Sequence, residues 1–378
     1  MSQESHSTDK EIQPLREEIN QIDAQIVELL DKRAKNARKI GEIKGKTDSP
    51  VYRPERENEV ILMAVNHSDG TLKPEGISSI FKEIMSACRS LEKKTTVAFL
   101  GPRGTFSEMA MFKQFGRSIQ GIACDQIEEV FRAVEAGTAQ FGIVPMENST
   151  EGSVNRTLDA LLRTSLSIIA EVSVPVHHNL LTKSGTLEGI TRIYSHPQSL
   201  GQCVGWLNSN VPDLPRMSAA SNGDAARKAS EDPTIAAIAG ETAAEAFGLK
   251  PVFEHIQDDA GNRTRFVVLA KQGTEPSKAP AKDKTSLIIS VPHKAGAIYH
   301  ALKPLDYHNV SMTKFESRPA RSGTWEYYFY IDIEGHCKSP DISRALNDLK
   351  DECAFFKNLG SYPVEEDFGP KHNTGAKL

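Results

Sequence analysis

A long apolar stripe near the start of the 378-residue chain constrains its fold more than any other feature of the sequence. Apolar side chains recur there at the period of an α-helix over more than thirty residues. At ~1.5 Å per residue, such a helix is about 50 Å long, and a unit of about 85 residues cannot cover it alone. We therefore expect it to pair with the same helix of a second chain. The stripe comprises Ile12, Leu15, Ile19, Ile22, Ile26, Leu29, Leu30, Ala37, Ile40 and Ile43.

Proline and glycine positions predict where this helix ends and where two more begin. Gly45 follows the stripe and is a typical C-terminal stop. Pro54 and the neighbourhood of Pro74 favour new helices, because proline is well tolerated in a first helical turn. We therefore assign residues 10–93 to an all-helical domain.

The rest of the chain divides into three segments with different sequence patterns. Residues 95–272 alternate short apolar runs with helical stretches, which is typical of an α/β sheet domain. Residues 273–284 are rich in Pro, Ala, Lys and Ser and are interpreted as a linker. Residues 285–363 follow a strand, helix, strand, strand, helix, strand order.

Composition excludes several classes of function. The formal net charge of −5 and the pI of about 6.2 leave no basic excess for nucleic acid. No apolar stretch approaches the ~18 residues of a membrane span, and the polar first ten residues do not form a secretory signal. The five cysteines lack zinc spacing and predict reduced thiols in a cytoplasmic protein. The His177–His178 pair has no ligand-forming acid or Cys near it, so we expect a structural role and no metal.

Cations accompany the N-terminal apolar stripe. Arg33 and Lys44 are eleven residues apart, close to three full turns, and share a helix face with Ala37 and Ile40. Arg16 lies ~25 Å away along the axis and about 100° around it, so it could join them only from an antiparallel second chain. Taken singly, each of these charges is better explained by a solvated helix face than by a ligand contact.

As an ordered series, the pieces of this segment resemble the all-helical class of chorismate mutase. That resemblance implies a pericyclic conversion of chorismate to prephenate, which needs a folded substrate and stabilised charge but no nucleophile or metal. The matching pieces are LREEI (15–19), LLDKRA (29–34), IGEIK (40–44), VYRPERE (51–57) and IFKEIMSAC with the following LE (80–92).

By position in the resemblance, Arg16 of a partner chain and Arg33 would bind the substrate carboxylates, since arginine suits bidentate contacts. Lys44 would reach the ether oxygen, Glu57 would bind a hydroxyl, and Arg56 would have a supporting role.

Glu92 stands where relatives carry Gln or Glu. A glutamate can donate a hydrogen bond to the ether oxygen only when it is protonated, which requires a raised pKa. The alternative is an exposed glutamate that ends the third helix.

Four motifs of the α/β segment lie where strands run into polar loops or helices. Strand alternation places Thr264 and Phe266 on one face and Arg265 on the other. Each motif alone is explained by a turn with a helix cap, but together they resemble prephenate dehydratase from Val97 to Ala270. The resemblance implies two α/β lobes around a cleft, similar to type 2 periplasmic binding proteins, with a second lobe at roughly 172–250. The motifs are GPRGTFSEMA (101–110), VPMENSTEGSV (144–154), YSHPQSLGQC (194–203) and NRTRFVVLA (262–270).

The implied reaction removes a carboxylate as CO2 and a hydroxyl as water from prephenate, which becomes aromatic phenylpyruvate. Thr264 is the candidate donor to the leaving hydroxyl, through an oriented hydrogen bond or a relay. Glu147, Asn148, Ser195 and Gln202 are carried over from the matching motifs as cleft residues.

The C-terminal segment resembles the ACT domain in the version attached to prephenate dehydratases. The resemblance implies L-phenylalanine as an allosteric ligand, bound where two such domains pair. The alternative is a plain sheet-pairing module. The residues implied are Gly296, Ala297 and Ile298 in the first motif, and Glu316, Ser317, Arg318 and Pro319 in the second.

Together these resemblances predict a multidomain fold: an all-α helical dimer, a two-lobed α/β domain and an α+β ferredoxin-like ACT domain. The predicted function is a homodimeric or tetrameric enzyme that makes phenylpyruvate from chorismate under phenylalanine feedback, without metal or organic cofactor. One rival is a non-catalytic sensor that joins a binding cleft to an ACT module, which predicts loss of Thr264 and of the mutase cations; neither is lost. Another is a mutase–dehydrogenase fusion, but no dinucleotide fingerprint follows a strand.

Overall fold

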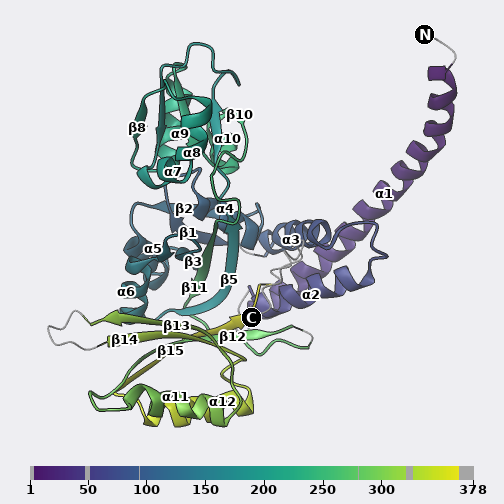
Figure 1. The fold of residues 1–378 in the computed structure, drawn as a ribbon. Helices are drawn as coiled ribbons and strands as arrows, with labels where there is room; N and C mark the ends of the chain where they lie inside the picture. Colours follow the sequence, from purple (N-terminus) through teal and green to yellow (C-terminus); the bar gives the residue numbers. More distant parts are fainter. Residues whose placement is uncertain (1–3, 47–51, 93, 280, 321–326, 366–378) are drawn as a thin grey trace.

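The computed structural model describes residues 4–46, 52–92, 94–279, 281–320 and 327–365. Three helices come first, and α1 projects beyond the rest of the molecule at its N-terminal end (Figure 1). The Gly45 N–H donates to the Gly41 carbonyl oxygen at 2.8 Å, so α1 ends where the sequence predicts. The helices are α1 (Glu4–Lys44), α2 (Pro54–His67) and α3 (Pro74–Ser90).

The apolar stripe of α1 is largely exposed in the single chain. Leu15, Ile19 and Leu29 are 59%, 55% and 61% exposed to solvent. The helix packs on α3, whose own apolar face buries Ile77 and Met85. Most of the stripe therefore has no apolar partner within the described chain.

Lobe 1 of the α/β region is a sheet in the order β2-β1-β3-β11-β5, with β4 paired to β3. The long strand β11 returns from lobe 2 and lies antiparallel to both β3 and β5. The strands are β1 (Thr96–Leu100), β2 (Gln120–Cys124), β3 (Phe141–Asn148), β4 (Gly152–Ser153), β5 (Ser167–Pro175) and β11 (Arg263–Ala270). The helices of lobe 1 are α4 (Phe106–Phe115), α5 (Ile127–Glu135) and α6 (Asn155–Arg163).

Lobe 2 is a sheet in the order β10-β6-β9-β7-β8. The expected start of this lobe near residue 172 is wrong, because β5 stays paired with β11 as far as Pro175. The strands are β6 (Asn179–Thr182), β7 (Arg192–Ser195), β8 (Arg216–Ser218), β9 (Ile235–Ala239) and β10 (Lys250–Phe253). The helices are α7 (Pro197–Gln202), α8 (Val204–Asn210), α9 (Asn222–Glu231) and α10 (Glu241–Phe247).

The C-terminal domain has the predicted strand and helix order, and its sheet runs β13-β14-β12-β15 with antiparallel neighbours. β12 begins at Asp283, so the last two residues of the expected linker belong to the strand. The elements are β12 (Asp283–Ser290), α11 (Ala297–Tyr307), β13 (Met312–Pro319), β14 (Tyr327–Glu334), α12 (Pro340–Asp351) and β15 (Phe355–Pro363).

The two faces of this C-terminal sheet have different partners. Leu287 and Ile331 pack in the core beneath α11 and α12, whereas Ile288 and Tyr330 join the core of lobe 1. The two helices lie on the side of this sheet that points away from lobe 1 (Figure 1). At Gly360, a Cβ atom would lie 2.2 Å from the Ile168 carbonyl oxygen, so β15 approaches β5 too closely for any side chain there. The C-terminal domain and lobe 1 thus share one buried core.

Candidate functional sites

A cleft of about 410 Å³ separates the two lobes of the α/β region. Lobe 1 contributes the ends of β3 and β11 and the start of α4, and lobe 2 contributes α7 and the start of α9. Of the five residues predicted for this site, Asn148, Gln202 and Thr264 line the cleft.

Thr264 and Asn148 are register partners on β11 and β3, and their side chains meet at the cleft. The Asn148 Oδ1 atom accepts the backbone N–H groups of Thr150 and Glu151, both at 3.0 Å. That fixes the amide orientation, so Nδ2 donates to the Thr264 Oγ1 atom at 2.9 Å. Because Thr264 accepts this bond, its own hydroxyl hydrogen stays free for a ligand.

Asn222, at the start of α9, presents a second amide to the cleft. Its Oδ1 atom accepts hydrogen bonds from the Ser199 hydroxyl at 3.0 Å and the His196 N–H at 3.3 Å, which leaves Nδ2 for a ligand. The predicted Ser195 is fully buried behind it, with Oγ 3.0 Å from the Asn222 Oδ1 atom and 2.7 Å from the Ile238 carbonyl oxygen. Ser195 therefore supports the cleft wall and does not face the cleft.

His178 also lines the cleft, although its sequence context indicates only a structural role. Burial lowers the pKa of His178, so the ring is neutral at neutral pH. Its Nε2 atom lies 2.9 Å from the Gln202 Oε1 atom. Because that oxygen can only accept, His178 donates, and the Gln202 amide nitrogen is left to donate to a ligand.

The cleft lining includes polar side chains but carries no fixed positive charge: among the described residues that form it, none is Lys or Arg. Amide and hydroxyl hydrogens are therefore its donors to an anion. A carboxylate bound by neutral donors is held less strongly than one bound by a cation.

The prediction that Glu147 lies in the cleft is wrong. Glu147 precedes Asn148 on β3, and successive strand side chains point to opposite faces. Its carboxylate pairs with Arg265 at 2.9 Å and with Lys314 of the C-terminal domain. Burial would raise the pKa of Glu147, but Lys314 and Arg265 lower it to about 2.

Arg265 lies on the opposite face of β11 from Thr264, as the strand alternation predicts. It pairs with Glu171 of β5 at 3.1 Å and with Asp332 of β14 at 3.2 Å. One strand thus carries a cleft residue on one face and an interdomain ion-pair network on the other.

A second constellation lies where α1, α2 and α3 meet. Arg89 is 5% exposed, pairs with the Glu57 carboxylate and donates to the Phe115 carbonyl oxygen at 2.7 Å. Burial raises the pKa of Glu57, while the charges of Arg89 and, more weakly, Arg33 act in the opposite direction. The buried Arg89 thus holds the predicted Glu57 in place.

Glu92, just beyond α3, packs against α1. A Cβ atom at Gly41 would lie 2.5 Å from its Cγ atom, so a larger residue at this position would displace the Glu92 side chain. Burial raises the pKa of Glu92, while Lys44 and Arg89 act to lower it. The Oε2 atom is buried and has no hydrogen-bond partner among the described residues. It is therefore a group that a ligand could satisfy.

Two predicted mutase residues lie elsewhere. Arg56 is mainly exposed on α2 and pairs with Glu59 at 2.7 Å. Arg16 is seventeen residues before Arg33 on one continuous helix, which separates them by ~25 Å. The single chain therefore brings together Arg33, Glu57 and Arg89 but leaves Arg16 apart.

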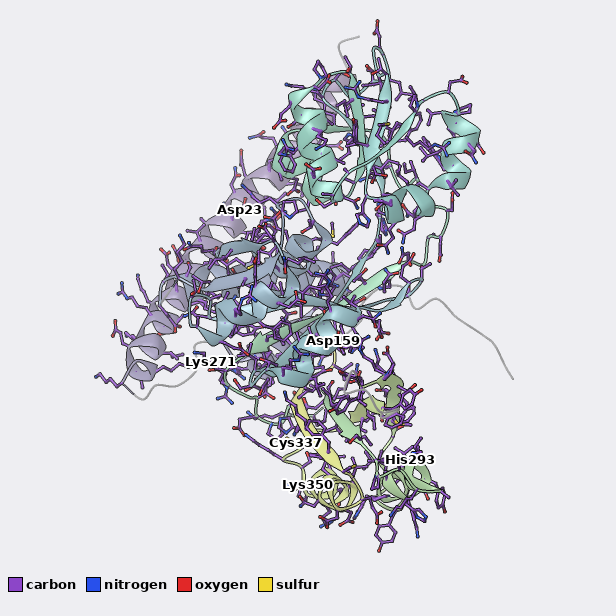
Figure 2. All side chains as sticks on the ribbon, turned by 90° about the vertical axis from the view of Figure 1, so that its left-hand side faces the viewer. Asp23, Asp159, Lys271, His293, Cys337 and Lys350 are labelled. Atoms are coloured by element: carbon purple, nitrogen blue, oxygen red, sulfur yellow. The ribbon has the colours of Figure 1, made fainter. Side chains whose placement is uncertain are left out.

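The predicted regulatory residues of β13 divide between its two faces. Arg318 forms a bidentate pair with Asp159 of α6, with both N–O distances at 2.8 Å, on the side of lobe 1 that faces the C-terminal domain (Figure 2). Glu316 accepts a hydrogen bond from Ser153 of β4. Ser317 pairs in register with Phe329, whose side chain belongs to the core beneath the helices.

The residues of the first regulatory motif surround the start of α11. Gly296 caps the helix with φ of 74°, a conformation that favours glycine. Ala297 is buried and Ile298 is 42% exposed, whereas Pro319 is exposed at the end of β13. These residues therefore do not form one enclosed pocket within the single chain.

Sequence reasoning missed Arg89, Asn222 and the cleft position of His178. Arg89 had a signal, because it is a charge beside buried positions of the third helix, and such charges need partners. Asn222 follows the helix-capping Ser221 directly, so the sequence could have predicted its location at the start of a helix. No local pattern indicated that His178 would reach Gln202.

Among the described residues, no helix is long and apolar enough to span a membrane. The described His, Cys, Asp and Glu side chains form no group that could hold a metal ion.

Comparisons with known proteins match two parts of the chain separately. The pattern of the family "Chorismate mutase type II" matches residues 15–93, and that of "Prephenate dehydratase" matches residues 97–274. The bifunctional chorismate mutase/prephenate dehydratase of Neisseria gonorrhoeae is 46% identical over 95% of this chain and 99% of its own length.

Two solved structures each resemble more than two thirds of the chain. A prephenate dehydratase from Arthrobacter aurescens in complex with L-Phe is 33% identical, covering 73% of this chain and 92% of its own, with a TM-score of 0.66. GqqA, described as a novel type of quorum quenching acylase, is 28% identical, covering 71% of this chain and 98% of its own, with a TM-score of 0.65. With the two family patterns and a relative that matches nearly end to end, the chain belongs to the family of bifunctional chorismate mutase/prephenate dehydratases.

Proposed function

We propose that the cleft converts prephenate to phenylpyruvate with the Thr264 hydroxyl as donor to the leaving hydroxyl group. The observation that supports this role most directly is the fixed Asn148–Thr264 hydrogen bond, which leaves the hydroxyl hydrogen of Thr264 available on the cleft side. Asn222 and Gln202 supply amide donors that orient the substrate. Since the described lining holds no cation, the ionised ring carboxylate is not stabilised by an ion pair. The electrons of its bond to the ring can therefore form the aromatic ring as CO2 leaves and the protonated hydroxyl departs as water.

We further propose that the helical constellation rearranges chorismate to prephenate. Arg33 and Lys44 lie on the stretch of α1 whose charges act on Glu57 and Glu92. A protonated Glu92 beside Lys44 would stabilise the negative charge that grows on the ether oxygen. The buried, unpartnered Oε2 atom of Glu92 supports this role. Glu57, held by Arg89, remains the candidate for a substrate hydroxyl.

A homodimer through α1 belongs to this proposal. The exposed apolar stripe needs a cover, and a second antiparallel copy of α1 has the matching length and chemistry. Such a partner would bring its Arg16 to the Arg33 end of the site. Arg56 would support the mutase site only indirectly, through its ion pair with Glu59 on the surface of α2.

The C-terminal domain is proposed to be an ACT domain with a ferredoxin-like fold that binds L-phenylalanine between paired copies. The strand order and the two helices on one face support the fold. Gly296 and Ser317 lie on the helix side of the sheet, where a ligand would be held. Glu316 and Arg318 of the same strand contact lobe 1, so a shift of β13 would reach the dehydratase lobe. A cytoplasmic location stays a prediction.

One assay tests the whole proposal. Purified protein is incubated with chorismate, and prephenate and phenylpyruvate are followed with and without L-phenylalanine. We expect both products in sequence and less phenylpyruvate when phenylalanine is present. Binding of prephenate without turnover would instead support a non-catalytic sensor, the alternative from a different class.

A further inference from the structure

A second cavity, of about 540 Å³, lies outside both proposed active sites, where three parts of the chain meet. Its walls come from α3 of the helical domain, α4, β5 and β11 of lobe 1, and β12 of the C-terminal domain. Unlike the dehydratase cleft, it is lined by cations from each of these parts. They are Lys82, Lys113, Arg263, Arg265 and Lys284.

Two of these cations are already neutralised. Arg265 and Lys284 share the buried carboxylate of Glu171, at 3.1 Å and 2.9 Å. Lys82 forms no ion pair with a described residue, and burial together with the neighbouring Lys113 lowers its pKa. A desolvated ammonium group beside a second one is costly without an anion.

The chain itself supplies a carboxylate to this cavity. Glu365, two residues beyond the end of β15, accepts a hydrogen bond from the Lys113 ammonium at 2.7 Å through Oε1. Its Oε2 atom accepts the Ser173 backbone N–H at 2.6 Å. A cation on one oxygen and a backbone donor on the other is the arrangement expected for a bound carboxylate. The cavity therefore already accommodates this chemical group.

We propose that the junction cavity is a binding site for a small organic dicarboxylate, with Glu365 as the resident group that such a ligand displaces. Once Glu365 leaves, Lys82, Lys113 and Arg263 line the cavity without an ion-pair partner among the described residues, and these cations can bind the two carboxylates of a dianion. Phe112 and Pro175 add apolar surface for a carbon skeleton. A ligand here would bridge α3 to lobe 1 and thereby stabilise the junction of the helical domain.

The first test measures ligand-dependent stability in the full-length protein. Thermal midpoints are recorded with increasing disodium succinate and with sodium chloride at matched ionic strength. Since ligands that bind only the folded state raise its stability, succinate should raise the midpoint beyond chloride. Glu365→Gln should tighten succinate binding about tenfold, because a charge-assisted competitor is lost. Lys113→Met should abolish the extra shift.

Matched controls come from an exposed pair of the same chemistry. Lys338 and Glu275 form an ion pair at 2.7 Å away from the cavity, so Lys338→Met and Glu275→Gln should leave the succinate response as in the wild type. An effect of succinate no larger than that of chloride, or an undiminished effect in Lys113→Met, would overturn the proposal.

A second arm tests whether the site needs two carboxylates. Calorimetric titrations with succinate, a dicarboxylate, and with phenylpyruvate, a monocarboxylate, are compared between wild type, Lys82→Met and Lys338→Met. We expect Lys82→Met to weaken succinate binding and to leave the phenylpyruvate titration as in the wild type, whereas Lys338→Met should change neither. Succinate titrations that are identical in all three proteins, or a loss of phenylpyruvate binding in Lys82→Met equal to that of succinate, would contradict a dicarboxylate site.

Discussion

The side-chain amide of Asn148 donates a 2.9 Å hydrogen bond to the hydroxyl oxygen of Thr264 across the β3–β11 pair. Two backbone N–H groups hold the Asn148 oxygen on the other side, so the amide cannot turn without losing them. This one relationship decides that Thr264 is a donor toward the cleft, because its oxygen is already engaged as an acceptor.

Removing the Thr264 hydroxyl while keeping its branched shape should strongly impair the dehydratase. We expect Thr264→Val to lower kcat by ~10²- to 10³-fold, the usual loss for one positioned donor. Thr264→Ser should keep most of the activity, since the hydroxyl remains. Phenylpyruvate formation from prephenate measures the effect, and mutase activity of the same samples is the control. Comparable activity in Val and Ser variants would remove Thr264 from the chemistry.

Reversing the Asn148–Thr264 hydrogen bond should be as harmful as deleting the hydroxyl. In Asn148→Asp, the second carboxylate oxygen can only accept, so it takes the Thr264 hydrogen away from the substrate. Asn148→Ala leaves that hydrogen free and should retain more activity. Steady-state kinetics on prephenate compare the two variants. The opposite order, with Ala more impaired than Asp, would show that Thr264 is not the donor.

The mutase should lose activity as pH rises through the pKa of Glu92. Burial raises this pKa, so the neutral, donating form persists to a higher pH than for an ordinary glutamate. Above it, the ionised group repels the charge that develops on the ether oxygen. Glu92→Gln should flatten the alkaline side of the mutase pH profile without altering that of the dehydratase. An unchanged profile in the Gln variant would identify Glu92 as a structural helix end.

Mixed dimers should test the shared mutase site. Arg16→Ala and Arg33→Ala proteins should each lack mutase activity, since each would spoil both sites of a homodimer. After subunit exchange, a mixed dimer would rebuild one complete site and recover part of the activity. Dehydratase activity, which needs neither residue, serves as the concentration control. No recovery despite proven exchange would place Arg16 outside the site.

Acid should weaken the contact between lobe 1 and the C-terminal domain through Glu147. Its pKa is about 2 in the folded state against an ordinary 4.5, so its stabilising effect is complete above the ordinary value and is lost as pH falls toward 2. Glu147→Gln should therefore reduce the drop in urea midpoint between pH 5 and pH 2. Lys314→Met should remove part of the same dependence, because it removes one of the partners that lower this pKa. Equal acid sensitivity in wild type and Glu147→Gln would contradict this account.

The sequence by itself determined the elements, because their signals are local. The apolar period predicted α1 and its end at Gly45, and prolines marked the starts of α2 and α3. Strand alternation alone predicted that Thr264 and Arg265 lie on opposite faces of β11, and the cleft and the ion-pair network confirm it. These inferences hold since backbone period and turn chemistry depend on neighbours in the chain.

Only the tertiary structure decided which side chains meet. Glu147 and Asn148 share one motif, yet pleating sends Glu147 to Lys314 of another domain and Asn148 to Thr264. The second regulatory motif, residues 316–319, is likewise divided between the two faces of β13. Arg318 forms an ion pair with Asp159, whereas Ser317 lies on the face of the sheet that carries α11 and α12. Arg89 of α3 forms an ion pair with Glu57 of α2, a contact that cannot be predicted from the spacing of these residues in the sequence. Such partners are set by packing between segments far apart in the chain, where burial requires each charge to find a counter-charge.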